Sequence, residues 1–415
     1  MLWIIMPTGT THGWGVCGKY LALEMSQLAR VRFITDNIES ERENNRVYYE
    51  RLSEIHTPLE HIGSLLGPRG RYKLREPMLQ AIRGADLKPW QIEVRAPRMV
   101  GYTFFEKTTL KKDDIAQAMD YFDWVVAGST WCERILKERG LDNSSTILQG
   151  IDTGRFHAGF SEKQRFKDRF VVFSGGKIEF RKGQDLVIRA FKVLQDKYDD
   201  VLLVNCWHNA WDSITSTMFL SPHFRFEMPR GDYVSAVNHL LSVNGIHPEK
   251  AVVLPPINNA QIAEVYRDSN CGLFPNRGEG GTNLVLMEYM ACGKPVIASF
   301  NSGHMDVLSS DHAILLEDQR PLNIAKPDGT LYTTWYESNL DEIIDRLDWA
   351  YNNRDEIGGI GLRGAEFMSQ LTWEKAAQEF HSLLLNGSTL PPCKPEDTQL
   401  SEPAPIGRVP FDRGN

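Results

Sequence analysis

The sequence predicts an α/β protein built from two doubly wound parallel-sheet domains that face each other across a cleft. One observation behind this prediction is length, because 415 residues exceed the roughly 100–200 residues of a typical domain. The other is that short apolar runs alternate with amphipathic stretches from end to end. This alternation is typical of parallel sheets whose two faces are both covered by helices.

The predicted strands and helices follow one another in a regular order. The chain opens with an apolar strand at Leu2 to Met6, a helical pattern from Val16 to Ala29 and a second strand at Val31 to Thr35. Similar apolar runs, each followed by a plausible helix, occur at Trp124 to Ala127, Val171 to Ser174, Val201 to Cys206, Val252 to Leu254, Cys271 to Pro275 and Val296 to Ser299. Strands that alternate with helices in this way predict parallel pairs joined by crossover helices.

The boundary between the domains is predicted after Gly150-Ile151-Asp152. A polar stretch with few aromatic residues follows it and precedes a strong apolar strand at residues 170–173. We therefore expect residues 1–160 to form the first domain and residues 161–371 to form the second.

The end of the chain predicts one more helix and then a tail. The segment 372–386 is amphipathic, and Thr372 is the expected N-cap of a helix there. Repeated prolines in residues 387–415 exclude regular secondary structure, so we expect this segment to lie extended or disordered.

Composition excludes several classes of protein. Lysine and arginine number 46 against 54 acidic residues, giving a net charge of −8, which argues against a broad duplex nucleic-acid interface. The six cysteines are scattered without the spacing of a zinc site. The apolar start stops at Pro7 and lacks a basic segment before it, so no signal peptide or membrane helix is predicted there and a cytoplasmic location is expected.

The first candidate ligand loop is Gly13-Trp14-Gly15-Val16-Cys17-Gly18, which has the glycine spacing of a dinucleotide-binding turn, with Asp36 after the next strand. One alternative is therefore an NAD(P)-dependent oxidoreductase that uses Gly13, Gly15 and Gly18. The residues Pro7 to His12 argue against it, because in that motif the strand runs directly into the first glycine. We favour a loop whose glycines let its backbone approach a ligand at the cleft; a turn without a ligand stays open.

The second candidate lies at 175–185, after the first strand of the second domain. Lys177 and Lys182 bracket a turn at the carboxyl end of that strand, where open α/β sheets bind ligands. Two ammonium groups that converge there suit a diphosphate. The alternative is a solvated charged loop, which is the usual setting of such residues.

The third and strongest candidate spans residues 274–296, where a strand ends in a glycine-rich loop and a helix follows. Thr282 or Asn283 can cap that helix, whose free amides would bind an anion such as phosphate. Glu279 in the loop and Glu288 on the helix then lie near the same ligand. Carboxylates and phosphates repel each other, so carboxylates in this position are expected to bind another part of the ligand. Sugar and ribose hydroxyl groups would suit Glu279 and Glu288.

These segments resemble the retaining GT-B glycosyltransferases of the family-four type, also described as glycosyl transferases group 1. The resemblance covers most of residues 170–308 and extends more weakly to 124–156, where Gln149-Gly150-Ile151-Asp152 matches the end of the first domain. It implies two Rossmann-like domains, a nucleotide-sugar donor bound to the second, and a final helix, 372–386, that returns to complete the first.

The resemblance also implies roles for individual residues in binding the donor. Lys177, where the family usually has arginine, and Lys182 would neutralise the donor diphosphate, Glu279 would hold hydroxyls of the transferred sugar, and Glu288 would hold the ribose. Backbone or side-chain donors to the distal phosphate are expected from Gly280, Gly281, Thr282 and Asn283. From the first domain, Gly13, Trp14 and Gly15 would face that phosphate, while His12 and Glu106 are expected on the acceptor side; Glu106 is equally compatible with a plain surface position.

The sequence departs from the family pattern at two places. Eight residues separate Glu279 from Glu288, whereas the family usually has seven, so the sugar pocket is expected to differ in shape. Lysine at position 177 loses the bidentate fork of arginine but keeps the positive charge.

The reaction that the resemblance implies needs no metal and no cofactor. The chain has no Asp-x-Asp pair of the kind that holds a divalent cation against a diphosphate, and lysines with a helix N-terminus can stabilise the leaving group instead. Retention of the anomeric configuration is expected, by same-face attack of the acceptor, with the departing phosphate taking its proton. A saccharide, lipid-linked or polymer acceptor is expected, and a catalytically silent GT-B scaffold is the remaining alternative.

A basic stretch in the first domain has two interpretations. Its members are Arg69, Arg71, Lys73, Arg75 and Arg83. It could meet an anionic acceptor or lipid headgroups in a peripheral membrane contact, although a run of charge is more often a solvated face.

Overall fold

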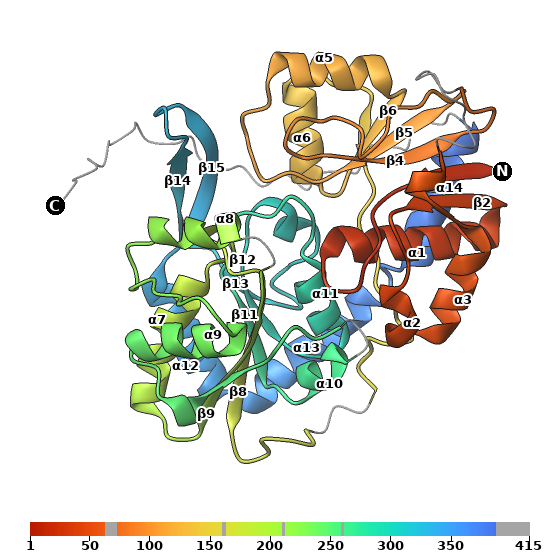
Figure 1. Cartoon of the computed structure of the whole chain (residues 1–415). Helices are drawn as coiled ribbons and strands as arrows, with labels where there is room; N and C mark the ends of the chain where they lie inside the picture. Colours follow the sequence, from red (N-terminus) through yellow and green to blue (C-terminus); the bar gives the residue numbers. More distant parts are fainter. Residues whose placement is uncertain (63–72, 160–162, 210–211, 259–260, 387–415) are drawn as a thin grey trace.

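A seven-stranded, entirely parallel sheet forms the centre of the first domain in the computed structural model, which describes residues 1–62, 73–159, 163–209, 212–258 and 261–386. Its strands lie in the order β3-β2-β1-β4-β5-β6-β7; β2, β4, β5 and β6 are labelled in Figure 1. Their bounds are β1 Leu2–Ile5, β2 Val31–Thr35, β3 His56–Pro58, β4 Met78–Ile82, β5 Met99–Thr103, β6 Trp124–Ala127 and β7 Ser144–Thr146. The order reverses between β1 and β4, which is the doubly wound arrangement.

A six-stranded parallel sheet forms the centre of the second domain, in the order β10-β9-β8-β11-β12-β13. Its strands are β8 Phe170–Gly176, β9 Val201–Trp207, β10 Ala251–Val253, β11 Cys271–Phe274, β12 Val296–Ser299 and β13 Ile314–Leu316. This order reverses between β8 and β11. The predicted class of two Rossmann-like α/β domains is therefore confirmed.

Helices cover the two sheets, which explains the nearly continuous apolar runs of the strands, since both faces of each central strand are buried. The first domain contains α1 Gly13–Leu28, α2 Ser40–Asn44, α3 Arg46–Ile55, α5 Lys112–Tyr121 and α6 Thr130–Glu138. The second contains α7 Gln184–Lys197, α8 Asp212–Thr215, α9 Tyr233–Val243, α10 Ile262–Arg267, α11 Leu284–Ala291, α12 Leu340–Asn352 and α13 Arg354–Met368. No described helix has both the length and the apolar character needed to span a membrane.

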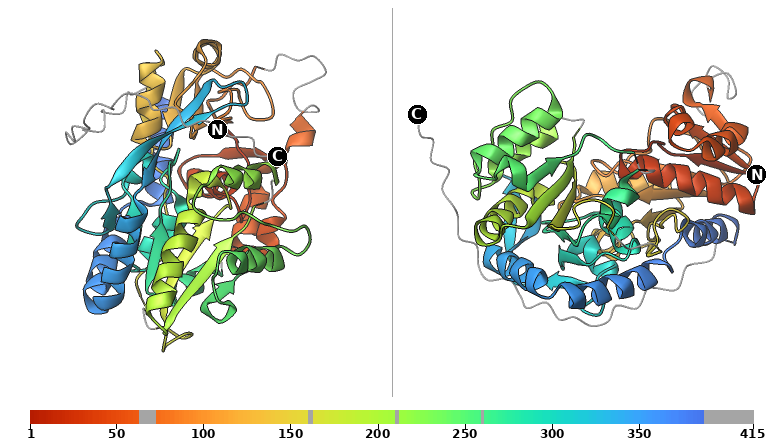
Figure 2. Two further views of the ribbon diagram at one scale, coloured as in Figure 1. Left: turned by 90° about the vertical axis from the view of Figure 1, so that its left-hand side faces the viewer. Right: turned by 90° about the horizontal axis from the view of Figure 1, so that it is seen from below.

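The chain crosses between the domains twice, and the two crossings lie side by side. Ile151 forms a parallel β-bridge with Thr372, and its amide donates to the carbonyl of Leu371 at 2.9 Å. Gly150 is required there, because a Cβ would lie 2.1 Å from the backbone nitrogen of Trp373. After the second crossing, α14 (Trp373–Asn386) packs against α1 of the first domain, as the resemblance implied (Figure 2).

One feature of the second domain was absent from the sequence prediction. An antiparallel hairpin, β14 Gln319–Ala325 and β15 Leu331–Ser338, stands apart from the central sheet and reaches the first domain (Figure 1). Both strands mix polar, charged and apolar residues without a sustained apolar run. A hairpin that lies largely outside the core needs none, so the apolar pattern used for the other strands could not find it.

Candidate functional site

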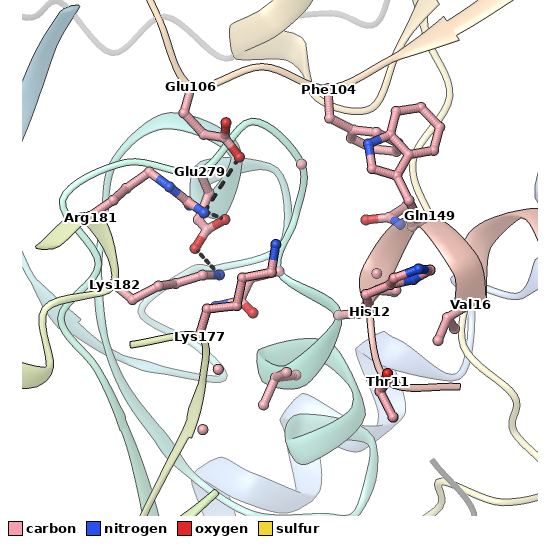
Figure 3. Close-up of a pocket in the computed structure, with 18 of the residues that line it drawn as sticks. Thr11, His12, Val16, Phe104, Glu106, Gln149, Lys177, Arg181, Lys182 and Glu279 are labelled. Carbon is pink, nitrogen blue, oxygen red and sulfur yellow. Dashed lines mark hydrogen bonds and ion pairs between the residues drawn. The ribbon is translucent and has the colours of Figure 1, made fainter. Parts of the chain in front are cut away.

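A cavity of about 700 Å³ lies between the two domains. Its walls are loops that follow the carboxyl ends of β1, β4 and β5 in the first domain and of β8, β9 and β11 in the second. This is the edge of an open parallel sheet at which ligands bind. The close-up in Figure 3 shows charged side chains of the second domain on one side and Thr11, His12 and Gln149 on the other.

Glu279 is the central acidic group of the cavity. It lies in the loop between β11 and α11, and only 4% of the residue is exposed. Its Oε2 lies 2.8 Å from Nη1 of Arg181, and its Oε1 lies 2.5 Å from Nζ of Lys182. Asn276 donates a further hydrogen bond to the same carboxylate. These partners hold the side chain in one orientation (Figure 3).

The electrostatic surroundings keep Glu279 ionised. Burial alone would raise the pKa of its carboxyl, but the positive charges of Arg181 and Lys182 outweigh that effect and hold the pKa well below its ordinary value. An ionised carboxylate accepts hydrogen bonds and donates none. Glu279 can therefore accept hydrogen bonds, for example from hydroxyl groups, and is not a proton donor at neutral pH.

Arg181 joins the two domains at this site. Its guanidinium bonds the carboxylate of Glu179 and donates to the carbonyl of Gly278 at 2.8 Å, in addition to its pair with Glu279. Across the cleft, its Nη2 lies 3.5 Å from Oε1 of Glu106 in the first domain. No role for Arg181 follows from the sequence pattern, and its position directly before Lys182 is the signal that could have found it.

The other predicted charged residues also line this cavity. Lys177 follows β8 and extends into the cavity beside Glu279 and Lys182 (Figure 3). Burial lowers the pKa of its ammonium group, and the negative charge of Glu179 opposes that shift. Glu288 lies on α11, buried, with the hydroxyl of Tyr266 3.5 Å from its Oε2. The structure thus brings Lys177, Lys182, Glu279 and Glu288 together around one space.

Some residues of the glycine-rich loop before α11 line the cavity, and others pack at the interface between the domains. Gly281 and Asn283 line the cavity, and Asn283 takes a left-handed conformation, φ 63°, as the residue before α11. Gly280 and Thr282 are not among the residues that line it, and their expected role as donors to a phosphate stays a prediction. A Cβ on Gly280 would lie 2.5 Å from the carbonyl oxygen of Phe105, and the buried Thr282 hydroxyl is directed to Sδ of Met287 at 2.9 Å.

The predicted glycine loop of the first domain is partly helical. Helix α1 begins at Gly13, so Gly13 and Trp14 reach the cavity from its first turn, whereas Gly15 does not line the cavity. The amide of Gly15 donates to Nδ1 of His12 at 2.9 Å, which removes it from the amides that could face a phosphate. His12 itself lines the cavity.

The same glycines leave the oxidoreductase alternative without support. Gly18 is packed so that a Cβ would lie 2.0 Å from the carbonyl oxygen of Pro7, which means that this glycine lets the segment 7–12 fold back over α1. The strand β1 ends at Ile5, well before Gly13. The glycine spacing thus serves loop packing rather than the direct strand-to-helix turn of a dinucleotide site.

The basic stretch of the first domain does not form one site in the described part of the chain. Lys73 and Arg75 are exposed and do not line the cavity. Arg83 lines the cavity and pairs with Asp86. Arg69 and Arg71 lie outside the described residues, as does the predicted tail, 387–415.

Contacts across the cleft hold the domains together beside the site. The Ser129 hydroxyl donates to the carbonyl of Gly280 at 2.8 Å. Thr130, in the first turn of α6, donates its backbone N–H at 2.7 Å and its hydroxyl to Asp306 of the second domain. Asp306 therefore satisfies a helix N-terminus of the other domain, and burial raises the pKa of its carboxyl to about 6.

Asp306 predicts a pH dependence of stability. Because its pKa is raised from 3.8 in the unfolded chain to about 6 in the folded one, the folded state binds more protons between these values. Its contribution to stability is full below that window and is lost as the pH rises through it. The melting temperature of Asp306→Asn, followed from pH 4 to pH 7, should therefore fall less with rising pH than that of the parent; parallel curves would refute the assignment.

Comparisons with known proteins agree with this arrangement. Residues 230–328 match the family model described as glycosyl transferases group 1. A D-inositol 3-phosphate glycosyltransferase of Paenarthrobacter aurescens is 22% identical over 242 residues, which cover 57% of this chain and 50% of that protein. The chain spans about half the length of the curated relatives that it matches.

Solved structures match nearly the whole chain. The Anabaena protein Alr3699/HepE, solved in complex with UDP and glucose, superposes with a TM-score of 0.61 at 12% identity, covering 93% of this chain and 99% of that one. Sucrose-phosphate synthase of Thermosynechococcus elongatus gives a TM-score of 0.61 at 14% identity, covering 92% and 97%. The predicted GT-B fold and the resemblance to the group 1 glycosyltransferases are confirmed.

Proposed function

We propose that this chain, which resembles the group 1 glycosyltransferases in sequence and in fold, is a retaining, metal-independent glycosyltransferase. It would move a sugar from a nucleotide-diphosphate sugar to a saccharide, lipid-linked or polymer acceptor. One observation carries the proposal: a buried, ionised carboxylate, three cationic side chains and the start of α11 line a single cavity between the domains. The oxidoreductase does not explain why these groups converge, and a measurement of turnover distinguishes the transferase from a silent scaffold that binds the same donor.

The donor diphosphate would bind between Lys177, Arg181 and Lys182 and the amides at the start of α11. Free helix N–H groups and the helix dipole favour an anion there. Because these groups are fixed before the reaction, they can stabilise the charge that develops on the diphosphate as its bond to the sugar breaks. Protein cations would then do the work that a divalent metal does in other transferases.

Glu279 would hold hydroxyl groups of the transferred sugar. Its low pKa keeps it an acceptor, and its ion pairs with Arg181 and Lys182 fix its direction. Glu288, nine positions further along the chain, would hold the ribose. The acceptor would attack on the face from which the diphosphate leaves, with the departing phosphate taking the acceptor proton, so the configuration of the sugar is retained. The interdomain contacts of Gly280 and Asp306 would limit the entry of water.

The donor is proposed to carry a nucleoside diphosphate, and UDP is the first to test. Support comes from the Anabaena protein, whose structures contain UDP, UDP with glucose, or UDP-glucose. The curated relatives are named for D-inositol 3-phosphate, but they share only about half of their length with this chain and differ from it in most residues.

A thermal-shift series tests donor binding. UDP, GDP, ADP, their sugar conjugates and NADH would be added in EDTA and then with magnesium. A ligand that binds only the folded state raises the melting temperature. When the ligand concentration is 100 times the dissociation constant, the unfolding free energy rises by about 2.7 kcal/mol. We expect a shift with one nucleoside diphosphate that persists in EDTA and that Lys182→Ala weakens.

Two results would count against the proposal. A shift with NADH alone would return the oxidoreductase to consideration. A nucleotide shift that requires magnesium would remove metal independence while leaving the transferase proposal in place. Lys192→Ala is the matched control for Lys182→Ala, because Lys192 forms an exposed ion pair on α7 with Asp196 and should leave the shift unchanged.

A further inference from the structure

The β14–β15 hairpin of the second domain is bonded to the loop that carries Glu106 in the first. The carbonyl of Glu106 accepts from the Trp335 indole at 2.7 Å and from the Thr333 hydroxyl at 3.1 Å. The backbone of Thr334 donates to the Thr108 hydroxyl at 3.2 Å, and the amide of Thr108 donates to the Thr333 hydroxyl at 3.2 Å. The hairpin thus fixes the backbone from which the Glu106 carboxylate enters the cavity.

Tyr332 is the one hairpin residue that lines the cavity among those the structure describes. The residue remains 37% exposed. Burial raises the pKa of its phenol, and the nearby Glu106 carboxylate adds to that effect. A protonated phenol both donates and accepts hydrogen bonds, and its ring offers an apolar face. Both properties suit a sugar.

The hairpin is held rigidly at its base. Glu337, near the end of β15, accepts from Nε of Arg277 at 2.9 Å, and the same guanidinium forms a two-pronged pair with Asp185 in the first turn of α7. Arg277 and Asp185 are fully buried. Tyr332 is therefore carried by a strand that is fixed both to the second domain and to the first.

The charges around Tyr332 indicate what this side of the cavity accepts. The carboxylate of Glu106 is the acidic group that the first domain contributes to the cavity lining. The two cations that this domain contributes are already engaged: Lys107 donates to the carbonyl of Ala85, and Arg83 pairs with Asp86. On the second-domain side, Arg181 lies 3.5 Å from Glu106 but is shared with the carboxylates of Glu179 and Glu279. An anionic group would therefore meet Glu106 beside cations that already have partners, whereas hydroxyl groups would find the Glu106 carboxylate as an acceptor and the Tyr332 phenol as a donor.

We propose that the acceptor subsite is shared between the domains, that Tyr332 contacts the acceptor, and that the subsite takes an uncharged saccharide rather than a sugar phosphate. The inference rests on the proposed glycosyltransferase function. In this arrangement the hairpin contacts the acceptor, and Glu279 with the cations around it binds the donor.

The test compares Tyr332→Phe, Tyr332→Ala and the control Tyr336→Phe. Tyr336 lies on the same strand, is similarly exposed, and does not line the cavity. The donor would be the nucleotide sugar that the parent protein turns over, and the acceptors would be neutral methyl glycosides and the corresponding sugar phosphates. Loss of one hydrogen bond should raise the acceptor KM about five-fold in Tyr332→Phe, and loss of the ring should raise it more in Tyr332→Ala.

The readouts separate this inference from the proposed function. We expect an unchanged donor KM, a larger share of donor hydrolysed by water in Tyr332→Ala, parental behaviour of Tyr336→Phe, and preference for neutral acceptors. An unchanged acceptor KM in Tyr332→Ala, or preference for sugar phosphates, would overturn the inference while the transferase assignment stands. Absence of any donor turnover by the parent would overturn both.

Discussion

Glu279→Gln is expected to lose nearly all turnover while still binding a nucleoside diphosphate. The neutral amide keeps the size of the side chain but loses the negative charge, and its NH₂ end would face cations. If Glu279 holds sugar hydroxyls in the transition state, kcat should fall by about 10²–10³-fold, as when one fixed polar group is removed from an active site. Because Arg181 and Lys182 lose their anionic partner, the diphosphate should bind as tightly as in the parent, or more tightly.

Steady-state release of nucleoside diphosphate and calorimetric titration with the same nucleotide would measure the two effects. Glu264→Gln is the control, since Glu264 forms an exposed ion pair with Arg165 on the surface. Parental turnover in Glu279→Gln would remove this residue from the reaction. Weaker nucleotide binding would instead mean that the carboxylate organises the cations for the diphosphate rather than competing with it.

Arg277→Met is expected to give the largest loss of stability. Arg277 is fully buried, pairs with Asp185 and Glu337, and lies with its guanidinium 3.8 Å from the ring centroid of Phe180. Removal of this cation would leave two buried carboxylates without their shared partner. Breaking a buried ion pair in this way costs about 3–5 kcal/mol of unfolding free energy.

Arg320→Met provides a matched comparison, because Arg320 pairs with the same carboxylate of Glu337 but its side chain is 68% exposed. Exposed pairs contribute about 1 kcal/mol or less. Urea unfolding of both variants should therefore show a large loss for Arg277→Met and a small one for Arg320→Met. Similar losses in the two would contradict the view that the buried network anchors the hairpin.

Much of the fold could be predicted from the sequence because buried parallel strands leave a strong local signal. The runs at Val171 to Ser174 and Val296 to Ser299 consist mainly of apolar residues, and both form central strands. The crossing after Gly150 could be placed because composition changes there. The helix predicted from Val16 begins instead at Gly13, because His12 caps it by accepting from the amide of Gly15.

The site was predictable where residues follow a strand in a motif, and not where they depend on packing between domains. Lys177, Lys182, Glu279 and Glu288 line one cavity, as the family resemblance implied. Arg181 gains its importance from Glu106, which is 75 positions away in the sequence. Nothing local distinguishes Gly280, which packs against Phe105, from Gly281, which lines the cavity.

The most direct test of the central claim is turnover of nucleotide sugars by the parent protein in EDTA. UDP-, GDP- and ADP-sugars would be incubated with neutral saccharide acceptors, and nuclear magnetic resonance would follow the anomeric proton of the first product formed. The account predicts transfer from one donor in EDTA, with the anomeric configuration of that donor kept in the product. No transfer from any donor would contradict the glycosyltransferase assignment, and an inverted product would contradict the retaining mechanism.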